Sequence, residues 1–247
     1  MNDTVRGLIL RQTDYKEADV ILQVLTKEYG MIAFRASGIR RMTSKNAGSV
    51  FPYTEADLSF DYKDGRTIFR LKTARTANLY RRMHTDMEMT AAAALVSEIA
   101  EQLTPHDDIS HASQAYDLLK RAYELINEGA HIHTCTTLFI ADMMRLNGIT
   151  PQVDACLGCG RGDIAAFSAK EGGFLCRDCA AALGIMPQQT VDLKRIRLLV
   201  RATLARYELV IASTQAQLSD AVLLVEMIRT HTGTQVRSFR FYETAVQ

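Results

Sequence analysis

Residues 156–179 read CLGCGRGDIAAFSAKEGGFLCRDC, with two Cys-x-x-Cys pairs separated by residues 160–175. Two thiolates separated by two residues can turn toward one ion, and a second such pair completes a tetrahedron around Zn²⁺. We therefore predict one structural zinc ion with four ligands: Cys156, Cys159, Cys176 and Cys179. Two disulfides or four free thiols are the alternatives, but disulfides persist mainly in secreted proteins, and nothing else here suggests secretion.

The residues between the two pairs have the pattern of a short hairpin. Residues 165–167 and 174–175 are apolar, and the connection over residues 168–173 ends in two glycines. Gly158 and Gly160 suit the tight turn of the first pair, where unusual backbone angles are needed. The stretch thus predicts a zinc ribbon. A closed site of four cysteines leaves no open coordination position, so the metal should fold the segment rather than catalyse.

The bulk composition, 47% apolar and 23% charged, is that of an ordinary globular protein. No apolar run approaches the roughly eighteen residues that a membrane span needs, so we expect no membrane partner. The first residues lack a basic region followed by an apolar one, and we expect no signal peptide. Four cysteines with metal spacing fit the reducing cytoplasm, and Cys135 lies in an apolar helical pattern typical of a core.

Charge is unevenly distributed along the chain, although the net charge is only +1. Residues 1–82 contain 15 Lys or Arg against 9 Asp or Glu, a net of +6. Residues 83–150 are net −7, and residues 151–247 are net +2. The attraction for a polyanion is therefore expected in the N-terminal third.

The N-terminal third has the pattern of strands. Alternation is strictest over residues 56–62, and Lys63-Asp64-Gly65 predicts a hairpin turn into the next strand. The five expected strands cover residues 5–10, 18–26, 31–36, 56–62 and 69–73. Five short strands in under 80 residues suggest a small barrel, and the OB-fold is the candidate of matching size.

A basic loop follows the third expected strand, since residues 35–45 contain four cations and no acid. A second row of cations occupies the solvent-facing side of the fifth strand. We predict that both sets contact DNA: Arg35, Arg40, Arg41, Lys45, Arg66, Arg70, Lys72 and Arg75. A merely solvated loop is the alternative. OB barrels bind single strands through a positive groove and aromatic platforms; the candidates here, which equally fit a core, are Tyr15, Tyr29, Phe51, Tyr53 and Phe69.

From Thr85 the hydrophobic period becomes helical, and residues 85–88 (TDME) form a capping box before the first helix. Expected helices cover residues 85–104, 110–127, 132–146, 191–207 and 216–230, and residues 235–242 form a strand or a helical turn. We predict an α+β protein, with an OB-fold domain at 1–80 and a helical domain at 81–247, interrupted by a zinc motif at 152–183. His131, His133 and Cys135 are two residues apart and point to different helix faces, which disfavours a second metal site.

Searches for catalytic motifs are negative. The chain has no phosphate-binding glycine loop, nucleophile elbow or His-Glu-x-x-His motif, and no carboxylate pair beside a nucleophile. We therefore expect neither an enzyme nor a small-molecule substrate.

The order of these parts resembles the RecO family of bacterial DNA repair proteins. The resemblance rests on GLILR at residues 7–11, DYKEAD at 14–19, SGIRR at 37–41, NGI at 147–149 before the first cysteine pair, and GGFLC at 172–176. It covers essentially the whole chain. It implies an OB-fold that binds single- and double-stranded DNA, a helical domain and a zinc motif, in a cytoplasmic, nucleoid-associated protein.

The resemblance also implies a function in DNA repair and recombination. Members anneal complementary strands and, with RecR, help RecA displace single-strand binding protein (SSB). They bind the acidic C-terminal tail of SSB through the helical region. Two sets of cations here suit such an anion, and the sequence does not choose between them: Lys120, Arg121 and Arg145, or Lys194, Arg195, Arg197 and Arg201. An adaptor that bridges proteins without binding DNA and a zinc-dependent nucleic-acid enzyme are the rival interpretations; the closed cysteine set argues against the second.

Overall fold

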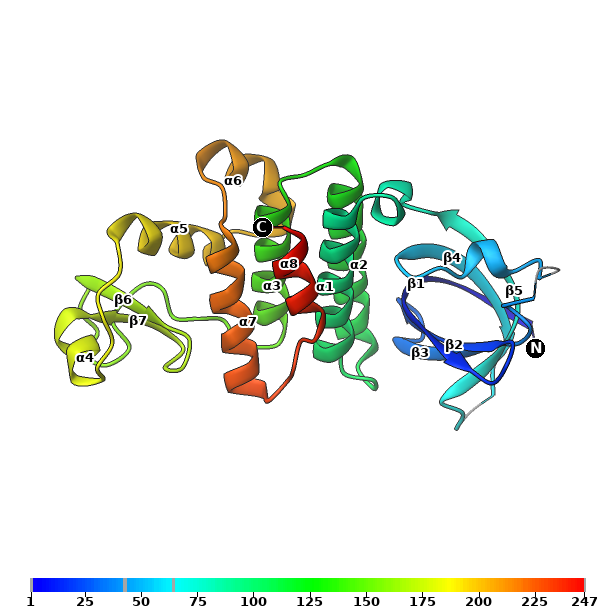
Figure 1. Ribbon diagram of the computed structural model, residues 1–247. Helices are drawn as coiled ribbons and strands as arrows, with labels where there is room; N and C mark the ends of the chain where they lie inside the picture. The colour runs from blue at the N-terminus through cyan, green and yellow to red at the C-terminus, as the bar shows by residue number, and fades with distance from the viewer. Residues whose placement is uncertain (1, 42–43, 64, 247) are drawn as a thin grey trace. The chain divides into compact units, whose positions relative to one another are not determined.

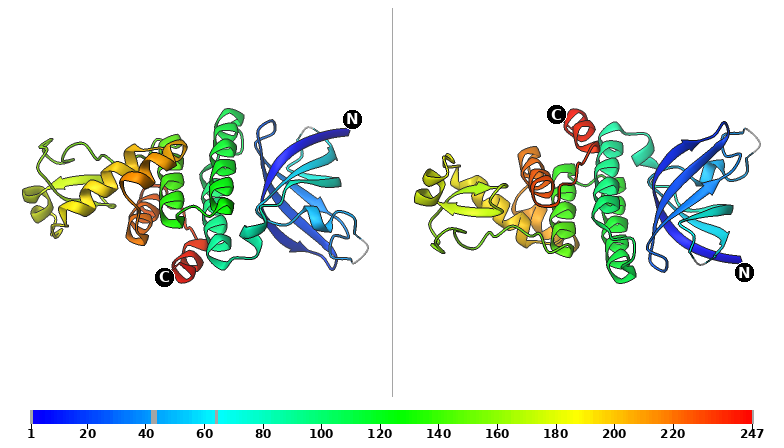
Figure 2. Two further views of the ribbon diagram at one scale, coloured as in Figure 1. Left: turned by 90° about the horizontal axis from the view of Figure 1, so that it is seen from above. Right: turned by 90° about the horizontal axis from the view of Figure 1, so that it is seen from below.

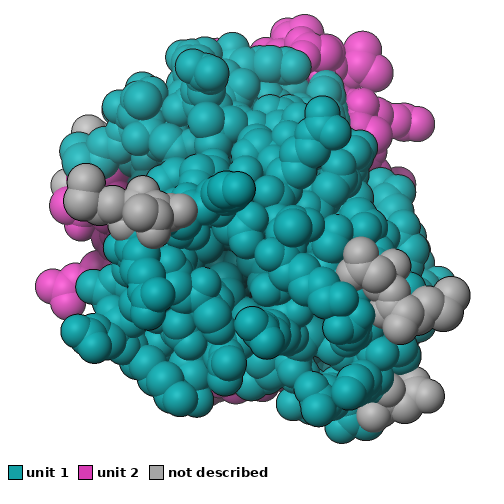
Figure 3. Space-filling model, turned by 90° about the vertical axis from the view of Figure 1, so that its right-hand side faces the viewer, with its two compact units in different colours: residues 1–128 teal, residues 129–247 magenta. Residues whose placement is uncertain are grey.

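The computed structural model of the chain describes residues 2–41, 44–63 and 65–246. The chain divides into two compact units, residues 1–128 and residues 129–247, which are coloured separately in Figure 3. The first unit contains a closed five-stranded barrel followed by two long helices (Figure 1). The second contains the two-stranded ribbon and the remaining helices.

The barrel is an OB-fold, as the sequence predicts. Its strand order is β1-β2-β3-β5-β4, with β3 and β5 parallel, and Figure 2 shows the strands wrapped around a common axis. The long first strand closes it, because β1 pairs with β4 over residues 2–9 and with β2 over residues 7–15. The strands are β1 (Asn2–Tyr15), β2 (Asp19–Thr26), β3 (Met31–Ala36), β4 (Thr54–Asp61) and β5 (Ile68–Asn78).

Alternation along the strands builds the barrel core. Leu58 and Phe60 of β4 and Phe69 of β5 are buried, whereas Tyr62, the last residue of the predicted alternation, is exposed. Phe60 lies edge-on to Phe34 and to Phe69, each with ring centroids 5.1 Å apart. β4 and β5 pair antiparallel, as predicted; Asp64 of the predicted turn lies outside the described residues.

Two helices complete the first unit, α1 (Met87–Leu103) and α2 (Ile109–Glu128), after a short 3₁₀ turn η2 (Arg81–His84). Asp86, rather than the predicted Thr85, is the N-cap of α1, since its carboxylate accepts a 3.1 Å hydrogen bond from the Met89 N–H. The Thr85 hydroxyl instead donates to backbone carbonyls of the preceding turn. The capping prediction was therefore wrong by one residue.

The second unit is organised around the buried helix α3 (Ile132–Leu146), which contacts α5, α6 and α7. The ribbon consists of β6 (Ile164–Ser168) and β7 (Gly173–Cys176), followed directly by α4 (Arg177–Ala182). The other helices are α5 (Thr190–Arg201), α6 (Tyr207–Ser213), α7 (Leu218–Thr232) and α8 (Ser238–Ala245), with 3₁₀ turn η3 (Leu204–Arg206) before α6. No helix of the described residues is long and apolar enough to cross a membrane.

One expected helix of this unit is shorter than predicted, and the C-terminal segment adopts the helical one of its two predicted conformations. The helix predicted over residues 191–207 ends at Arg201, and the Leu204 N–H donates a 2.7 Å hydrogen bond to the buried Asp142 of α3. The C-terminal segment forms helix α8, because the Tyr242 side chain is fully buried and its hydroxyl is 2.8 Å from the Thr136 hydroxyl. Both segments make hydrogen bonds to α3.

Candidate metal centre and nucleic-acid interface

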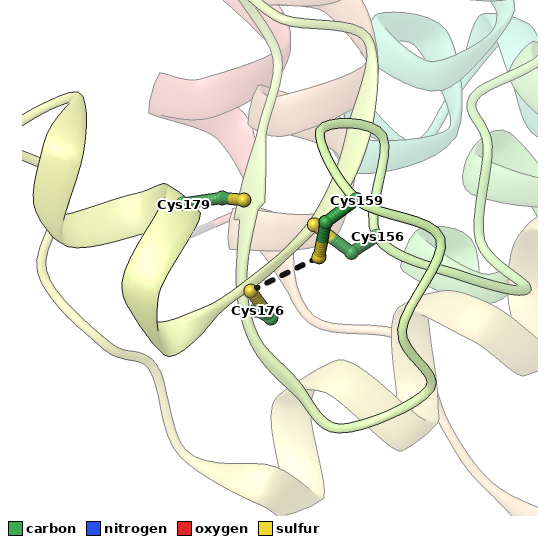
Figure 4. Close-up of side chains that lie close together, drawn as sticks. All are labelled: Cys156, Cys159, Cys176 and Cys179. Carbon is green, nitrogen blue, oxygen red and sulfur yellow. Dashed lines mark hydrogen bonds between the residues drawn. The ribbon is translucent and has the colours of Figure 1, made fainter.

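The four predicted ligands converge at one end of the ribbon (Figure 4). Cys176 is the last residue of β7 and the N-cap of α4, so Cys179 follows one turn later on the helix. Cys156 and Cys159 lie on a turn closed by a 2.8 Å hydrogen bond from the Gly160 N–H to the Cys156 carbonyl. The four Sγ atoms lie within 4.8 Å of one another.

This geometry fits a metal ion. The Sγ atoms of Cys159 and Cys176 are 3.6 Å apart, far longer than the roughly 2.05 Å of a disulfide. The edge of a zinc–thiolate tetrahedron with bonds of about 2.3 Å is roughly 3.8 Å. All four cysteines are free thiols, so the disulfide alternative does not describe this site. The four cysteines are therefore placed to hold a metal ion.

The surroundings of the sulfurs lower the pKa of Cys156 and Cys176 but raise that of Cys179. The backbone N–H of Cys176 donates to Cys156 and is the first cause that lowers the pKa of Cys156 to about 6. The pKa of Cys179 is raised to about 12, first because its thiol donates to Cys176 and then because Cys156 and Cys159 also accept from it. In the absence of metal, the Cys179 proton offsets part of the negative charge of the other sulfurs. A divalent cation in the cluster would take over that role.

Arg161 supplies a positive charge beside the cluster. Its Nη2 donates to the Cys176 Sγ at 3.2 Å and its Nε to the Cys159 Sγ at 3.4 Å, while Asp178 forms an ion pair with the same guanidinium. Hydrogen bonds of this kind orient thiolate ligands and reduce their repulsion. The sequence analysis missed Arg161, although its position directly after the first cysteine pair is the available signal.

The two glycines of the first pair are needed for different reasons. A Cβ atom at position 158 would lie 2.9 Å from the Cys179 Sγ, so only glycine leaves that sulfur its space. Gly160 has a φ of +74°, a conformation that side-chain-bearing residues rarely adopt. The predicted need for unusual backbone angles thus holds at Gly160, whereas Gly158 is required by close packing.

The predicted DNA-facing cations lie largely on one outer face of the barrel, formed by β2, β3 and β5. The register pairs Ile21 with Arg35 and Arg35 with Arg70, and all three alternate with buried neighbours, so their side chains face outward. We call this surface the β2–β3–β5 face. Lys72 follows on the same side of β5, whereas Arg75 lies opposite Asp57 of β4.

The basic loop is tethered to this face at both ends. The Gly38 N–H donates to the Asp19 carboxylate at 2.8 Å, and the Arg40 N–H donates to the Ala18 carbonyl. Beyond residues 42–43, which lie outside the described residues, the Asn46 side chain bonds to the backbone of Lys72 and Ala74. The loop therefore continues the cationic surface of β3 and β5.

The ion pairs divide these cations into two groups. Arg40 is 3.0 Å from Asp14, Lys72 is 2.6 Å from Asp61, and Arg35 is 3.8 Å from Asp19. Within the described ranges, the five other cations have no acidic side chain within 4 Å: Arg41, Lys45, Arg66, Arg70 and Arg75. The second group has its charge available to an external anion.

Comparison with known proteins identifies the family of the chain. The family model for the N-terminal part of recombination protein O matches residues 1–80, and the model for its C-terminal part matches residues 84–239. The chain belongs to the RecO family. Relatives named DNA repair protein RecO include that of Halalkalibacterium halodurans, 26% identical over 239 residues (96% of this chain, 92% of the relative), and that of Rubrobacter xylanophilus, 31% identical over 182 residues (70% of each).

Membership of the RecO family supports a role in DNA repair and confirms the resemblance drawn from the N-terminal motifs. The OB-fold and the cysteine cluster that this resemblance implies are both present. No second metal cluster occurs among the residues described. His131 caps α3, and the Nδ1 atom of His133 is 2.9 Å from the Tyr242 hydroxyl.

Three of the cations considered for an anion site have structural partners in this RecO-family chain. Lys120 is 2.8 Å from the buried Glu55, and Arg145 pairs with Asp142 and donates to two backbone carbonyls. Arg195 is buried, with Nε 2.7 Å and Nη2 3.1 Å from the two oxygens of Asp220. Their charges are used within the fold.

The remaining cations of the second set gather at one cleft. Lys194, Arg197 and Arg201 line a hollow of about 620 Å³, together with Arg206, which the sequence analysis missed because it follows the unexpected helix end. Arg197 and Arg201 share the exposed Asp154, so two positive charges face one negative charge. Leu198 and the exposed Leu209 add apolar surface. Arg121 belongs to α2 of the first unit, where it is 3.7 Å from Glu124.

Proposed function

We propose that this member of the RecO family is a DNA repair and recombination mediator. It would bind single- and double-stranded DNA, anneal complementary strands and, with RecR, help load RecA onto SSB-coated single strands at the nucleoid. The observation that carries the proposal is the register of Arg35 and Arg70 on the β2–β3–β5 face, continued by the basic loop. Annealing needs no catalytic group, and the chain has none of the catalytic motifs sought above.

The mechanism we propose is neutralisation of phosphate charge. Two single strands repel one another, and a cationic surface that binds both raises the chance that complementary bases meet. Contacts to phosphate position a strand without reading its sequence. The cysteine cluster would hold zinc as a structural ion that folds the ribbon, since four thiolates leave no coordination position for a substrate.

Strand annealing tests the proposal. Complementary oligonucleotides coated with SSB would be mixed with the wild type, with an Arg41→Ala/Arg70→Ala variant and with a matched Arg11→Ala/Arg6→Ala control. The control removes the same charge from barrel arginines that pair with Glu101 and Asp57. Annealing that only the first variant loses supports the proposal. A folded wild type that neither anneals nor binds DNA would leave the adaptor interpretation.

We further propose that the cleft of Lys194, Arg197 and Arg201 receives the acidic C-terminal tail of SSB. Its excess positive charge and the apolar Leu198 and Leu209 suit a peptide with acidic and apolar residues. Fluorescence anisotropy of a labelled tail peptide would test this. We expect Arg201→Glu to abolish binding and Arg121→Glu, on α2, to leave it unchanged; the reverse would refute the assignment.

A further inference from the structure

Besides the cleft of Lys194, Arg197 and Arg201 in the second unit, the first unit contains a hollow of about 560 Å³ at one end of the β2–β3–β5 face. Tyr29 of the β2–β3 turn, Tyr62 and Arg66 of the β4–β5 connection and Phe69 of β5 line it. His106 and Ile109, at the connection between α1 and α2, lie on its other side. The strand faces and β4–β5 loop of OB-folds are where oligomeric ligands generally bind.

Three aromatic rings in this hollow support one another. Tyr62 stacks on Phe69, with ring centroids 5.5 Å apart and planes inclined by 20°, and Tyr29 lies 5.4 Å from Tyr62. Phe69 is 4% exposed and belongs to the barrel core, whereas Tyr62 is 42% exposed. The core therefore fixes the orientation of a ring that solvent still reaches. A preoriented, accessible ring is a suitable platform for a planar base.

The polar groups of the hollow suit a base better than a phosphate. Glu28 lines the hollow and would repel a phosphate within it, but its carboxylate can accept from an N–H on the Watson–Crick edge of a base, such as N3–H of thymine. Gln23 and Thr67 provide both hydrogen-bond donors and acceptors. Arg66 is exposed at the same place and has no acidic partner within 4 Å among the residues described.

The register connects this hollow to the cations. Gln23, Ala33 and Ile68 form one outward row across β2, β3 and β5, and Ile21, Arg35 and Arg70 form the next. Rows two residues apart along a strand are separated by roughly 6.6 Å. A nucleotide whose base enters the hollow can therefore place a neighbouring phosphate near Arg35 and Arg70.

We propose that this hollow binds an unpaired base of single-stranded DNA, with Tyr62 as the stacking platform. The inference rests on the proposed function and names the part of the DNA that this face recognises. A paired and stacked base cannot enter the hollow, whereas phosphates are present in both forms of DNA. The site thus favours single strands. When the base pairs during annealing it leaves the hollow, so the protein binds the annealed product more weakly.

The test separates base binding from phosphate binding. Affinity would be measured for an oligothymidylate of about twelve nucleotides, within the usual site size of an OB-fold, and for an abasic strand with the same number of phosphates. Tyr62→Ala is the test variant, Tyr62→Phe retains the ring, and Phe241→Ala removes an aromatic ring of α8 that is similarly exposed, at 43%, outside the hollow.

We expect the wild type to bind oligothymidylate more tightly than the abasic strand. Tyr62→Ala should weaken oligothymidylate binding by roughly 5- to 150-fold and leave abasic-strand affinity unchanged. Tyr62→Phe and Phe241→Ala should bind as the wild type does. Equal affinity of the wild type for both strands, or an equal loss on both in Tyr62→Ala, would overturn the inference while leaving DNA binding intact. No binding to either strand would instead refute the proposed function.

Discussion

Removal of the metal is expected to unfold the ribbon and leave the barrel folded. The apolar cluster around the cysteines contains five buried residues, two of which, Cys156 and Cys176, are themselves predicted ligands. Three large apolar side chains of the ribbon strands are buried, Phe167, Phe174 and Leu175, and together their burial contributes about 4.5–9 kcal/mol. A structural zinc ion contributes on the order of 10–16 kcal/mol. The metal contribution is the larger of the two, and burial alone does not offset about 1–2 kcal/mol of backbone entropy per ordered residue, so the segment should not remain folded without the metal.

Amide hydrogen exchange resolved along the chain measures this directly. In a Cys179→Ser variant, or after chelation, β6, β7 and α4 should lose protection, while protection of β1 to β5 is retained because the barrel has its own core. Cys135→Ala is the matched control, since Cys135 is buried in α3 outside the cluster and this variant should keep one metal ion per chain. A metal-free protein with a fully protected ribbon would refute the reasoning.

Two further predictions concern single side chains. Arg195→Ala should lower the free energy of unfolding by about 3–5 kcal/mol, because it leaves the carboxylate of Asp220 buried without its partner; the neighbouring, exposed Lys194→Ala should cost less than about 0.5 kcal/mol. Urea titration of the metal-loaded proteins measures both, and equal losses would contradict the assignment. Gly158→Ala should weaken metal affinity by about 10-fold or more, because the new Cβ meets the Cys179 Sγ at 2.9 Å. Competition with a chelating dye tests this, and unchanged affinity would refute it.

The features predicted correctly from sequence are those encoded locally. The spacing of the four cysteines identifies the cluster, because ligands two residues apart converge through local turns. Alternation over residues 56–62 identifies β4, and the apolar period over residues 132–146 gives the bounds of α3. Five short strands in under 80 residues suggest the OB-fold, and the family motifs support it, although its parallel β3–β5 pairing has no local signature.

The features that the sequence left open or gave wrongly depend on distant residues. Arg195 is assigned to an anion site by its neighbours in sequence, but Asp220, on another helix, buries and pairs it. The end of α5 depends on Asp142 of α3, which binds the Leu204 N–H. The alternation predicts that Tyr62 is the last core residue of its strand, but its ring stacks on Phe69 and is exposed to solvent. The spacing of residues along the chain predicts none of these contacts.

The salt dependence of single-strand binding tests the central claim most directly. A plot of log affinity against log salt should fall with a slope of about 0.7 per phosphate neutralised. We expect Arg41→Ala/Arg70→Ala to reduce that slope by about 1.4, and Arg40→Ala, whose charge is shared with Asp14, to reduce it less. The control Arg11→Ala/Arg6→Ala should leave the slope unchanged. An unchanged slope in Arg41→Ala/Arg70→Ala, or the same reduction in the control, would contradict binding of DNA by the β2–β3–β5 face.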